Sequence, residues 1–210
     1  KYNLYLCSLT TISTDTAAAL AKSKCTYIFL WGLDNIDTDT ANALSAYEGF
    51  IVVGADTAAV SDFANAGCNL FCINLIEDEA DAHKFIKTTG KLLFFSCETP
   101  ILEVLVGHAG TSLQIGNTEI TEEQARILLN YKGELHLSSV NQLSDDVAAI
   151  IADFGLHLSF DVLETVSDSA IGFLAGHPSS LYLGANFPLT KARANILCEH
   201  QHELAFGHSS

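Results

Sequence analysis

Residues 3–25 read NLYLCSLTTISTDTAAALAKSKC, and residues 27–49 read YIFLWGLDNIDTDTANALSAYEG. Apolar residues recur at the same places in both segments, with a shift of 24 residues between them. The matching pairs are Leu4 and Ile28, Leu6 and Leu30, Leu9 and Leu33, and Ile12 and Ile36. Each segment begins like a short strand and continues into a helical piece. Repetition at this period indicates a stack of similar units, because one such unit cannot bury its apolar face alone.

A helix-cap position marks the repeat along the chain. It holds Ser, Thr or Asp, whose side-chain oxygen can accept a hydrogen bond from an N–H group at a helix start. The residues at this position are Ser13, Asp37, Thr57, Asp78, Thr99, Thr121, Ser144, Ser167 and Thr190, spaced by 20 to 24 residues. A mostly small residue follows four positions later and a mostly apolar residue seven positions later, which gives each helix one apolar stripe. The sequence therefore predicts a chain of units, each made of one strand, one turn and one short helix.

The strand pattern Leu4-Tyr-Leu6-x-x-Leu9-x-x-Ile12, seen again from Leu135 to Leu143, resembles that of the leucine-rich-repeat family. The resemblance covers nearly the whole chain. It implies an α/β solenoid of about nine repeats over residues 1–204, with parallel strands on one face, short helices on the other, and a C-terminal tail at residues 205–210. The Asn that many family members place after the strand is not repeated here. The family hosts many binding roles, so the resemblance implies a binding module without naming its partner.

Charge limits the partners that we expect. The chain carries 25 Asp and Glu against 10 Lys and Arg, a net charge of −15. Such a surface repels phosphate backbones and anionic membranes, so we expect no nucleic-acid partner. No apolar run reaches the ~18 residues that a membrane span needs. Most acidic residues fall in the first turns of the expected helices, where the helix dipole favours negative charge, and we interpret them as structural.

No catalytic or cofactor motif is recognisable in the sequence. The six cysteines show no zinc-ligand spacing, and we interpret them as small core residues. Buried thiols would favour a reducing compartment, but the localisation stays undecided. No nucleophile elbow, Walker loop or dinucleotide fingerprint occurs. We therefore expect no enzyme, no cofactor and no metal site. His136 and His157, which we place at the same strand position of successive repeats, are interpreted as an exposed polar pair, with a metal-binding pair as the alternative.

The outward positions of the first strands are rich in aromatic residues. Side chains of a strand alternate between the core and the open face, so inward Leu4 and Leu6 leave Tyr5 outward. The same count places Tyr5, Tyr27, Phe29, Trp31, Val52, Phe71 and Ile73 on the open face. In the fifth strand the outward residue is either Leu93 or Phe94. Later strands place mostly polar residues there, such as His136 and Ser159.

An apolar open face favours a binding role, because large exposed apolar patches mark interaction sites. We expect another protein to bind this face. The first alternative is a structural protein that assembles into dimers or fibres through the same face or the solenoid ends. The second is that preceding sequence or a shifted strand register covers the rings. The least favoured is an enzyme with its site near His136 and His157.

Overall fold

The computed structural model describes residues 2–54, 59–72, 76 and 78–207. The chain is an α/β protein in which short strands alternate with short helices, and ten strands form a parallel sheet in chain order. These strands are β1 (Asn3–Tyr5), β2 (Tyr27–Phe29), β3 (Phe50–Val53), β4 (Leu70–Cys72), β5 (Lys91–Phe94), β6 (Ser112–Ile115), β7 (Glu134–Leu137), β9 (Leu158–Phe160), β11 (Leu181–Gly184) and β12 (Leu204–Gly207). The short strands β8 (Gln142–Leu143) and β10 (Thr165–Val166) pair with each other in a second sheet.

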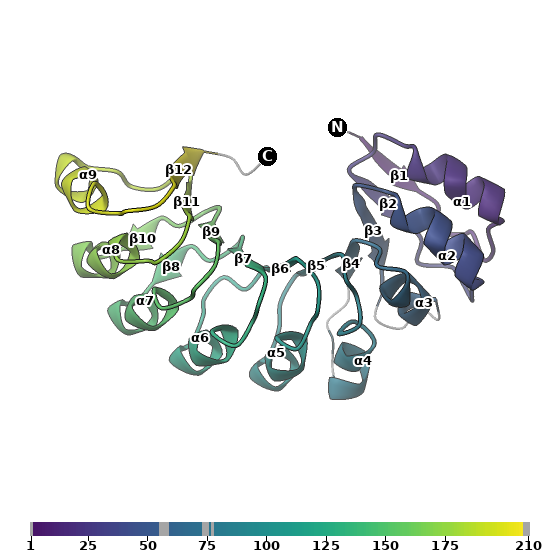
Figure 1. Cartoon of the computed structure of the whole chain (residues 1–210), viewed down its shortest axis with the longest axis horizontal. Coiled ribbons are helices and arrows are strands. Elements are labelled where there is room, and N and C mark those ends of the chain that lie inside the picture. Colours follow the sequence, from purple (N-terminus) through teal and green to yellow (C-terminus); the bar gives the residue numbers. More distant parts are fainter. Residues whose placement is uncertain (1, 55–58, 73–75, 77, 208–210) are drawn as a thin grey trace. The chain divides into compact units, whose positions relative to one another are not determined.

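The helices lie along one side of the strands in each part of the chain (Figure 1). They are α1 (Thr14–Ala21), α2 (Thr38–Ser45), α3 (Val60–Asn65), α4 (Glu79–His83), α5 (Thr99–Leu105), α6 (Glu122–Leu128), α7 (Asp145–Ile151), α8 (Asp168–Ala175) and α9 (Lys191–Leu197). In the described residues, no helix is long and apolar enough to cross a membrane. The strand–helix alternation predicted from the repeat is confirmed.

We expected one solenoid over residues 1–204, but the chain divides into two compact units, residues 1–113 and 114–210. The C-terminal tail was expected at residues 205–210. Residues 204–207 form β12, which pairs in parallel with β11 and so belongs to the sheet. Residues 208–210 lie outside the described part of the chain.

Most of the predicted helix caps are confirmed. The side chains of Ser13, Asp37, Asp78, Thr121, Ser144, Ser167 and Thr190 each accept a hydrogen bond from the backbone N–H three residues on. Thr99 is an error, because Glu98 has the extended backbone of a cap and Thr99 is already the first helical residue. Pro100 follows in the first turn, where its missing N–H costs no helical hydrogen bond. Thr57 lies outside the described residues.

The strand register stacks like positions on each other and places the apolar core between strands and helices. In residues 1–113, Ile28, Ile51, Leu70 and Leu92 occupy one register row and are almost fully buried. In residues 114–210 the corresponding row runs through Leu135, Leu158, Leu181 and Leu204. Cys25, Cys68, Cys72 and Cys97 are buried, as expected of core residues. The interpretation is wrong for Cys198, which is exposed, and Cys7 is only partly buried.

A second set of contacts joins neighbouring repeats at the C-terminal ends of the helices. The hydroxyl of Tyr47 donates to the carbonyl of Cys25 at 2.9 Å. The ring nitrogens of His177 lie 3.2 Å from the carbonyl oxygen of Ala152 and 3.0 Å from that of Leu156. Tyr47 and His177 both stand ten residues after a helix cap, at Asp37 and Ser167. A polar side chain at this position contacts backbone carbonyls of the preceding repeat, in the C-cap of its helix or in the segment that follows it.

Candidate functional site

The open strand face of residues 1–113 carries a cluster of aromatic rings, which we call the aromatic surface. Its members are Tyr5, Tyr27, Phe29, Trp31, Phe50, Phe71 and Phe95. Tyr5 on β1 stacks on Phe29 of β2, with ring centroids 4.4 Å apart and an angle of 17° between the planes. Trp31 meets the same Phe29 edge-on at 5.8 Å. The Tyr5–Phe29 contact arises because neighbouring strands are only ~4.8 Å apart, so outward rings in one register row must touch. Trp31 meets Phe29 because residues two apart along an extended segment point to the same face.

Tyr27 connects the two halves of this surface. Its ring lies 6.4 Å from Phe29, 6.0 Å from Phe50 and 5.7 Å from Phe71. Phe71 in turn lies 5.1 Å from Phe95. Each such pair contributes about 0.5–1.5 kcal/mol beyond the area that it buries. The rings therefore hold one another in place as a continuous layer, although much of each outer ring faces solvent.

Exposure is greatest at the ends of the layer. The exposed fraction is 64% for Tyr5, 44% for Trp31 and 61% for Phe95, whereas Tyr27, Phe29 and Phe71 are half-buried. Single exposed aromatic residues also occur elsewhere in the chain, such as Phe173 at 43%, so the notable feature here is that the exposed rings are contiguous.

Two residues predicted for the open face, Val52 and Ile73, are not among the exposed residues that the structure describes there. Val52 lies in the outward register row between Phe29 and Phe71, yet its exposed fraction is 0%. The ring of Tyr27 on β2 reaches Phe71 on β4, so their contact passes over β3 and covers Val52. Val52 is therefore the floor of the aromatic surface and cannot itself contact a partner. Ile73 lies outside the described residues.

The register of the fifth strand, left open by the sequence, is now settled. Phe71 pairs with Leu93, so Leu93 faces outward, while Phe94 packs in the core against Phe85 at 5.3 Å. Phe50 belongs to the aromatic surface but was not among the predicted binding residues, and neither was Phe95. Its signal was present, because alternation from an outward Leu93 leads directly to an outward Phe95.

The open strand face of residues 114–210 is polar. The Nδ1 atom of His136 lies 2.7 Å from Oγ of Ser159, and Nδ1 of His157 lies 2.8 Å from Oγ of Ser180. The two rings are 5.4 Å apart and half-buried. They do not share a strand position as expected, because His136 is paired with Ser159 and the two histidines are diagonal neighbours. The expected exposed polar pair is therefore a partly buried pair in which each histidine contacts a serine.

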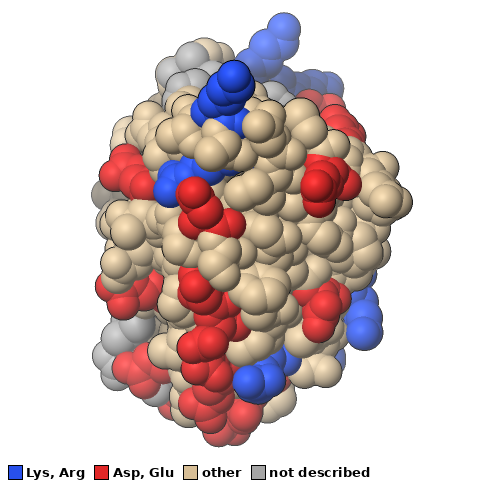
Figure 2. Space-filling view, turned by 90° about the vertical axis from the view of Figure 1, so that its left-hand side faces the viewer, with Lys and Arg blue, Asp and Glu red and all other residues tan. Residues whose placement is uncertain are grey.

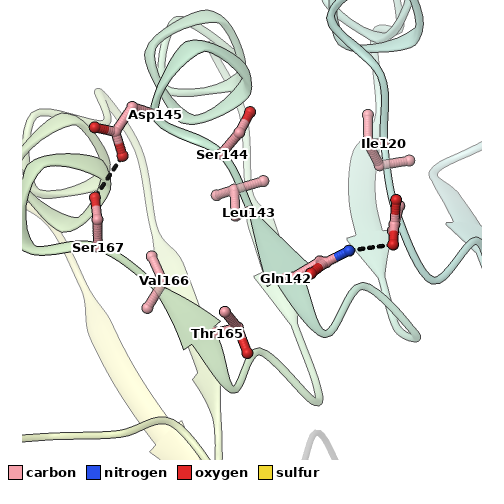
Figure 3. Close-up of a pocket in the computed structure, with 9 residues that line it drawn as sticks. Ile120, Gln142, Leu143, Ser144, Asp145, Thr165, Val166 and Ser167 are labelled. Carbon is pink, nitrogen blue, oxygen red and sulfur yellow. Dashed lines mark hydrogen bonds between the residues drawn. The ribbon is translucent and has the colours of Figure 1, made fainter.

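A hollow of about 630 Å³ lies on another side of the second unit (Figure 3). It is lined by Glu119, Ile120, Gln142, Leu143, Ser144, Asp145, Thr165, Val166 and Ser167. Gln142 donates a hydrogen bond to Glu119, and Ser167 donates one to Asp145. Several of its polar side chains therefore bond to one another across adjacent repeats.

Acidic side chains gather in a column on the face that Figure 2 shows. In residues 114–210 the first turns of α6, α7 and α8 hold Glu122, Glu123, Asp145, Asp146 and Asp168. Arg193 donates to Asp168 at 2.7 Å and also to the carbonyl oxygens of Pro188 and Val166. These positions and contacts support the interpretation of the acidic residues as structural.

Titratable groups in the core favour their neutral forms. Burial raises the pKa of Cys68 to about 12, and burial together with the nearby Cys72 raises the pKa of Cys97 to about 12. Burial lowers the pKa of His108 to about 4. Because only a thiolate is an effective nucleophile, Cys68 and Cys97 are chemically quiet at neutral pH. Among the described residues, no group of three or more His, Cys, Asp or Glu is placed to hold a metal ion.

Comparison with known proteins adds no family. No protein-family model matches the sequence, and no curated protein matches it. The fold alone therefore defines the class, a repeat-type α/β protein with a parallel sheet that alternates with helices.

Proposed function

We propose that this chain is a leucine-rich-repeat protein of about nine repeats whose aromatic surface binds another protein. The observation that carries the proposal is the layer of mutually stacked rings from Tyr5 to Phe95 on the open strand face. Tyr5, Trp31 and Phe95 present the largest exposed parts of this layer. Trp and Tyr are enriched among the residues that dominate the binding energy of protein interfaces.

The packing of the rings makes the aromatic surface rigid before a partner binds. Each exposed ring already leans on another, as Tyr5 does on Phe29 and Trp31 does on the same ring. A partner that docks on these rings orders few additional side chains, so it loses less conformational entropy on binding. Val52, with an exposed fraction of 0%, supports the rings from below.

The charge of the chain indicates the character of the partner. With a net charge of −15, the protein attracts a partner that is basic around its contact surface and repels phosphate backbones. Lys or Arg side chains of the partner can also lie over exposed ring faces, an interaction of about 0.5–1 kcal/mol at such sites. A basic protein with an apolar centre to its interface fits both features.

The test compares two aromatic residues of nearly equal exposure. Trp31 is 44% exposed on the aromatic surface, and Phe173 is 43% exposed on α8 in the other unit. Proteins retained by the wild-type chain are identified and quantified, and retention is then measured for Trp31→Ala and Phe173→Ala. We expect Trp31→Ala to weaken binding of the specific partner by about 2 kcal/mol, roughly thirtyfold, and Phe173→Ala to leave it unchanged. Equal retention by both variants would contradict the proposal.

A second copy of the chain is the other candidate occupant, because an apolar face can also bury itself against its own copy. The like charge of two copies, −15 each, opposes this pairing at low salt. Light scattering over a wide concentration range separates the two functions. If the wild-type chain forms a dimer and Trp31→Ala is monomeric, the result favours self-assembly. If the wild-type chain is monomeric at every concentration, the result favours binding of a different protein.

A further inference from the structure

Three imidazoles lie together where the last two repeats of the second unit meet. His177 follows α8, and His200 and His202 follow α9. The rings of His177 and His200 are nearly parallel, with centroids 6.4 Å apart and an angle of 8° between their planes. The His202 ring meets the His200 ring edge-on at 6.0 Å. We call α9, β12 and the segment between them, residues 191–207, the last repeat.

Each of the two stacked rings joins its own repeat to the preceding one. The Nδ1 and Nε2 atoms of His177 lie 3.2 Å and 3.0 Å from the carbonyl oxygens of Ala152 and Leu156. The Nδ1 atom of His200 lies 3.1 Å from the carbonyl oxygen of Ala175, the final residue of α8. The His200 side chain therefore connects the last repeat to the end of α8.

The last repeat helps to enclose both rings. His177 has an exposed fraction of 1%, and the stacked ring of His200 forms part of its surroundings. The Nε2 atom of His200 is itself buried and has no hydrogen-bond partner among the described residues. If the last repeat separates from α8, water reaches both imidazoles. Water can then hydrogen-bond to Nε2 of His200 and solvate a charged His177.

The surroundings of His177 disfavour a positive charge. Burial lowers the pKa of His177, its two carbonyl contacts act in the opposite direction, and positive charge on His200 or His157 lowers the pKa again. Within the described part of the chain, no carboxylate forms an ion pair with His177 or His200. The acidic residues that adjoin these contacts in the sequence are exposed to solvent; they are Asp153, Glu199 and Glu203. The closed state therefore binds a proton at His177 less readily than a state in which this ring is in water.

We propose that His177 and His200 form a pH-sensitive switch that releases the last repeat in mildly acidic solution. Because the pKa of His177 is lowered in the closed state, the stability of that state is fully present above pH 6.5 and is lost as the pH falls below this value. The last repeat is the part released because, in the described residues, β12 pairs with β11 alone. A repeat with one neighbour is held by fewer contacts than a repeat with two.

Release of the last repeat changes the surface of the second unit. It uncovers the edge of β11, which now pairs with β12. It also uncovers the ring of Phe187, which now lies 6.0 Å from that of Phe206 on β12. These groups lie in residues 114–210, so the switch is independent of the protein-binding function proposed above.

Hydrogen exchange of the full wild-type chain, followed by mass spectrometry, measures the release directly. After correction for the intrinsic effect of pH on exchange, we expect the opening equilibrium of residues 191–207 to rise at least about tenfold between about pH 8 and about pH 5. The opening of α6 and α7 in the same unit should rise much less. If residues 191–207 open in parallel with α6 and α7 over the whole range, the proposal is wrong.

A substitution shows whether His177 causes the pH dependence. His177→Phe keeps an aromatic ring that cannot titrate, and Phe154 holds the same position ten residues after a helix cap in the preceding repeat. We expect this variant to lose most of the pH-dependent opening of residues 191–207. His83→Phe is the matched control, because His83 is exposed on α4, and it should open like the wild type. Wild-type pH dependence in His177→Phe would overturn the proposal.

Proton NMR of the wild-type chain tests the same switch without any variant. The imidazole Hε1 signal reports whether a histidine ring is neutral or charged. We expect the signal of His177 to keep its neutral position while residues 191–207 are protected from exchange, and to move only as this protection is lost. A His177 ring that becomes charged while residues 191–207 stay protected would show that its proton does not release the last repeat.

Discussion

The two units build the same strand surface and finish it with different chemistry. Phe29, Val52 and Phe71 follow one another along an outward register row in residues 1–113. The corresponding row in residues 114–210 is His136, Ser159 and Tyr182. In the first row rings stack on rings, and in the second an imidazole contacts a hydroxyl. The comparison teaches that the inward residues and helix caps specify the backbone, while the outward residues differ between the two units and are where we propose that binding takes place.

Val52 and Ser159 occupy the same kind of place in these two rows, and both are almost fully buried although they point outward. Each is covered by larger neighbours on adjacent strands, aromatic rings over Val52 and the His136 ring beside Ser159. A small residue in the middle of a row thus serves as a floor on both surfaces. What covers it decides whether the surface is apolar or polar.

The largest expected effect comes from a charge placed on the apolar floor. Val52→Asp puts a carboxylate beneath the rings with no cationic partner introduced, and a buried unpaired charge costs several kcal/mol. We expect the free energy of unfolding of the unit to fall by about 4 kcal/mol, measured by urea denaturation followed by circular dichroism. Phe95→Asp is the control on the same surface, because Phe95 is 61% exposed and its carboxylate remains in water. If both variants lose the same stability, Val52 is not covered in solution.

The second prediction concerns pH and the position ten residues after the helix cap. His108 holds this position in residues 1–113, and Tyr131 and Phe154 hold it in residues 114–210. Burial lowers the pKa of His108 to about 4, against 6.5 for an unperturbed histidine. The unfolded chain therefore binds the proton first, and stability that is fully present above pH 6.5 is lost as the pH falls toward 4.

We expect this histidine to remove about 3 kcal/mol of stability between neutral pH and pH 4. His108→Phe imitates Phe154 and should flatten this part of the stability–pH curve. Urea denaturation at a series of pH values measures the effect. His83→Phe is a control, since His83 is exposed. If the wild-type curve has the same slope as that of His108→Phe, His108 binds its proton as readily in the folded chain as in the unfolded chain, and the prediction is wrong.

The comparison of the two units also shows which features the sequence could predict and which it could not. The helix caps and the alternation of strands and helices depend on contacts within a few residues, so residues such as Ser13 and Ser144 revealed them directly. The burial of Val52 depends on how far the ring of Tyr27 reaches across β3, and no local pattern contains that distance. Thr99 was predicted because Thr is a common cap residue, yet the helix starts directly after the extended backbone of Glu98, with Pro100 in its first turn.

The histidine–serine pairs show a similar limit. His136 and His157 are 21 residues apart, whereas the strands there repeat every 23 residues. The two histidines therefore fall on diagonal positions, and each meets a serine instead of the other histidine in its own row. An offset of two residues keeps a side chain on the same face of a strand, so the face was predicted correctly and the partner was not.

The prediction with the smallest effect tests whether the rings of the aromatic surface also stabilise the fold. Tyr5 lies at one end of the aromatic surface and stacks on Phe29 at 4.4 Å, but its side chain is 64% exposed. Tyr5→Leu keeps an apolar side chain and removes the stacked pair, so the free energy of unfolding should fall by only about 0.5–1.5 kcal/mol. Phe173→Leu, at a ring exposed on α8, should change it less. A loss at Tyr5 no larger than the loss at Phe173 would mean that the outer rings contribute nothing to folding. Their stacking would then serve only to preorganise the surface for a partner.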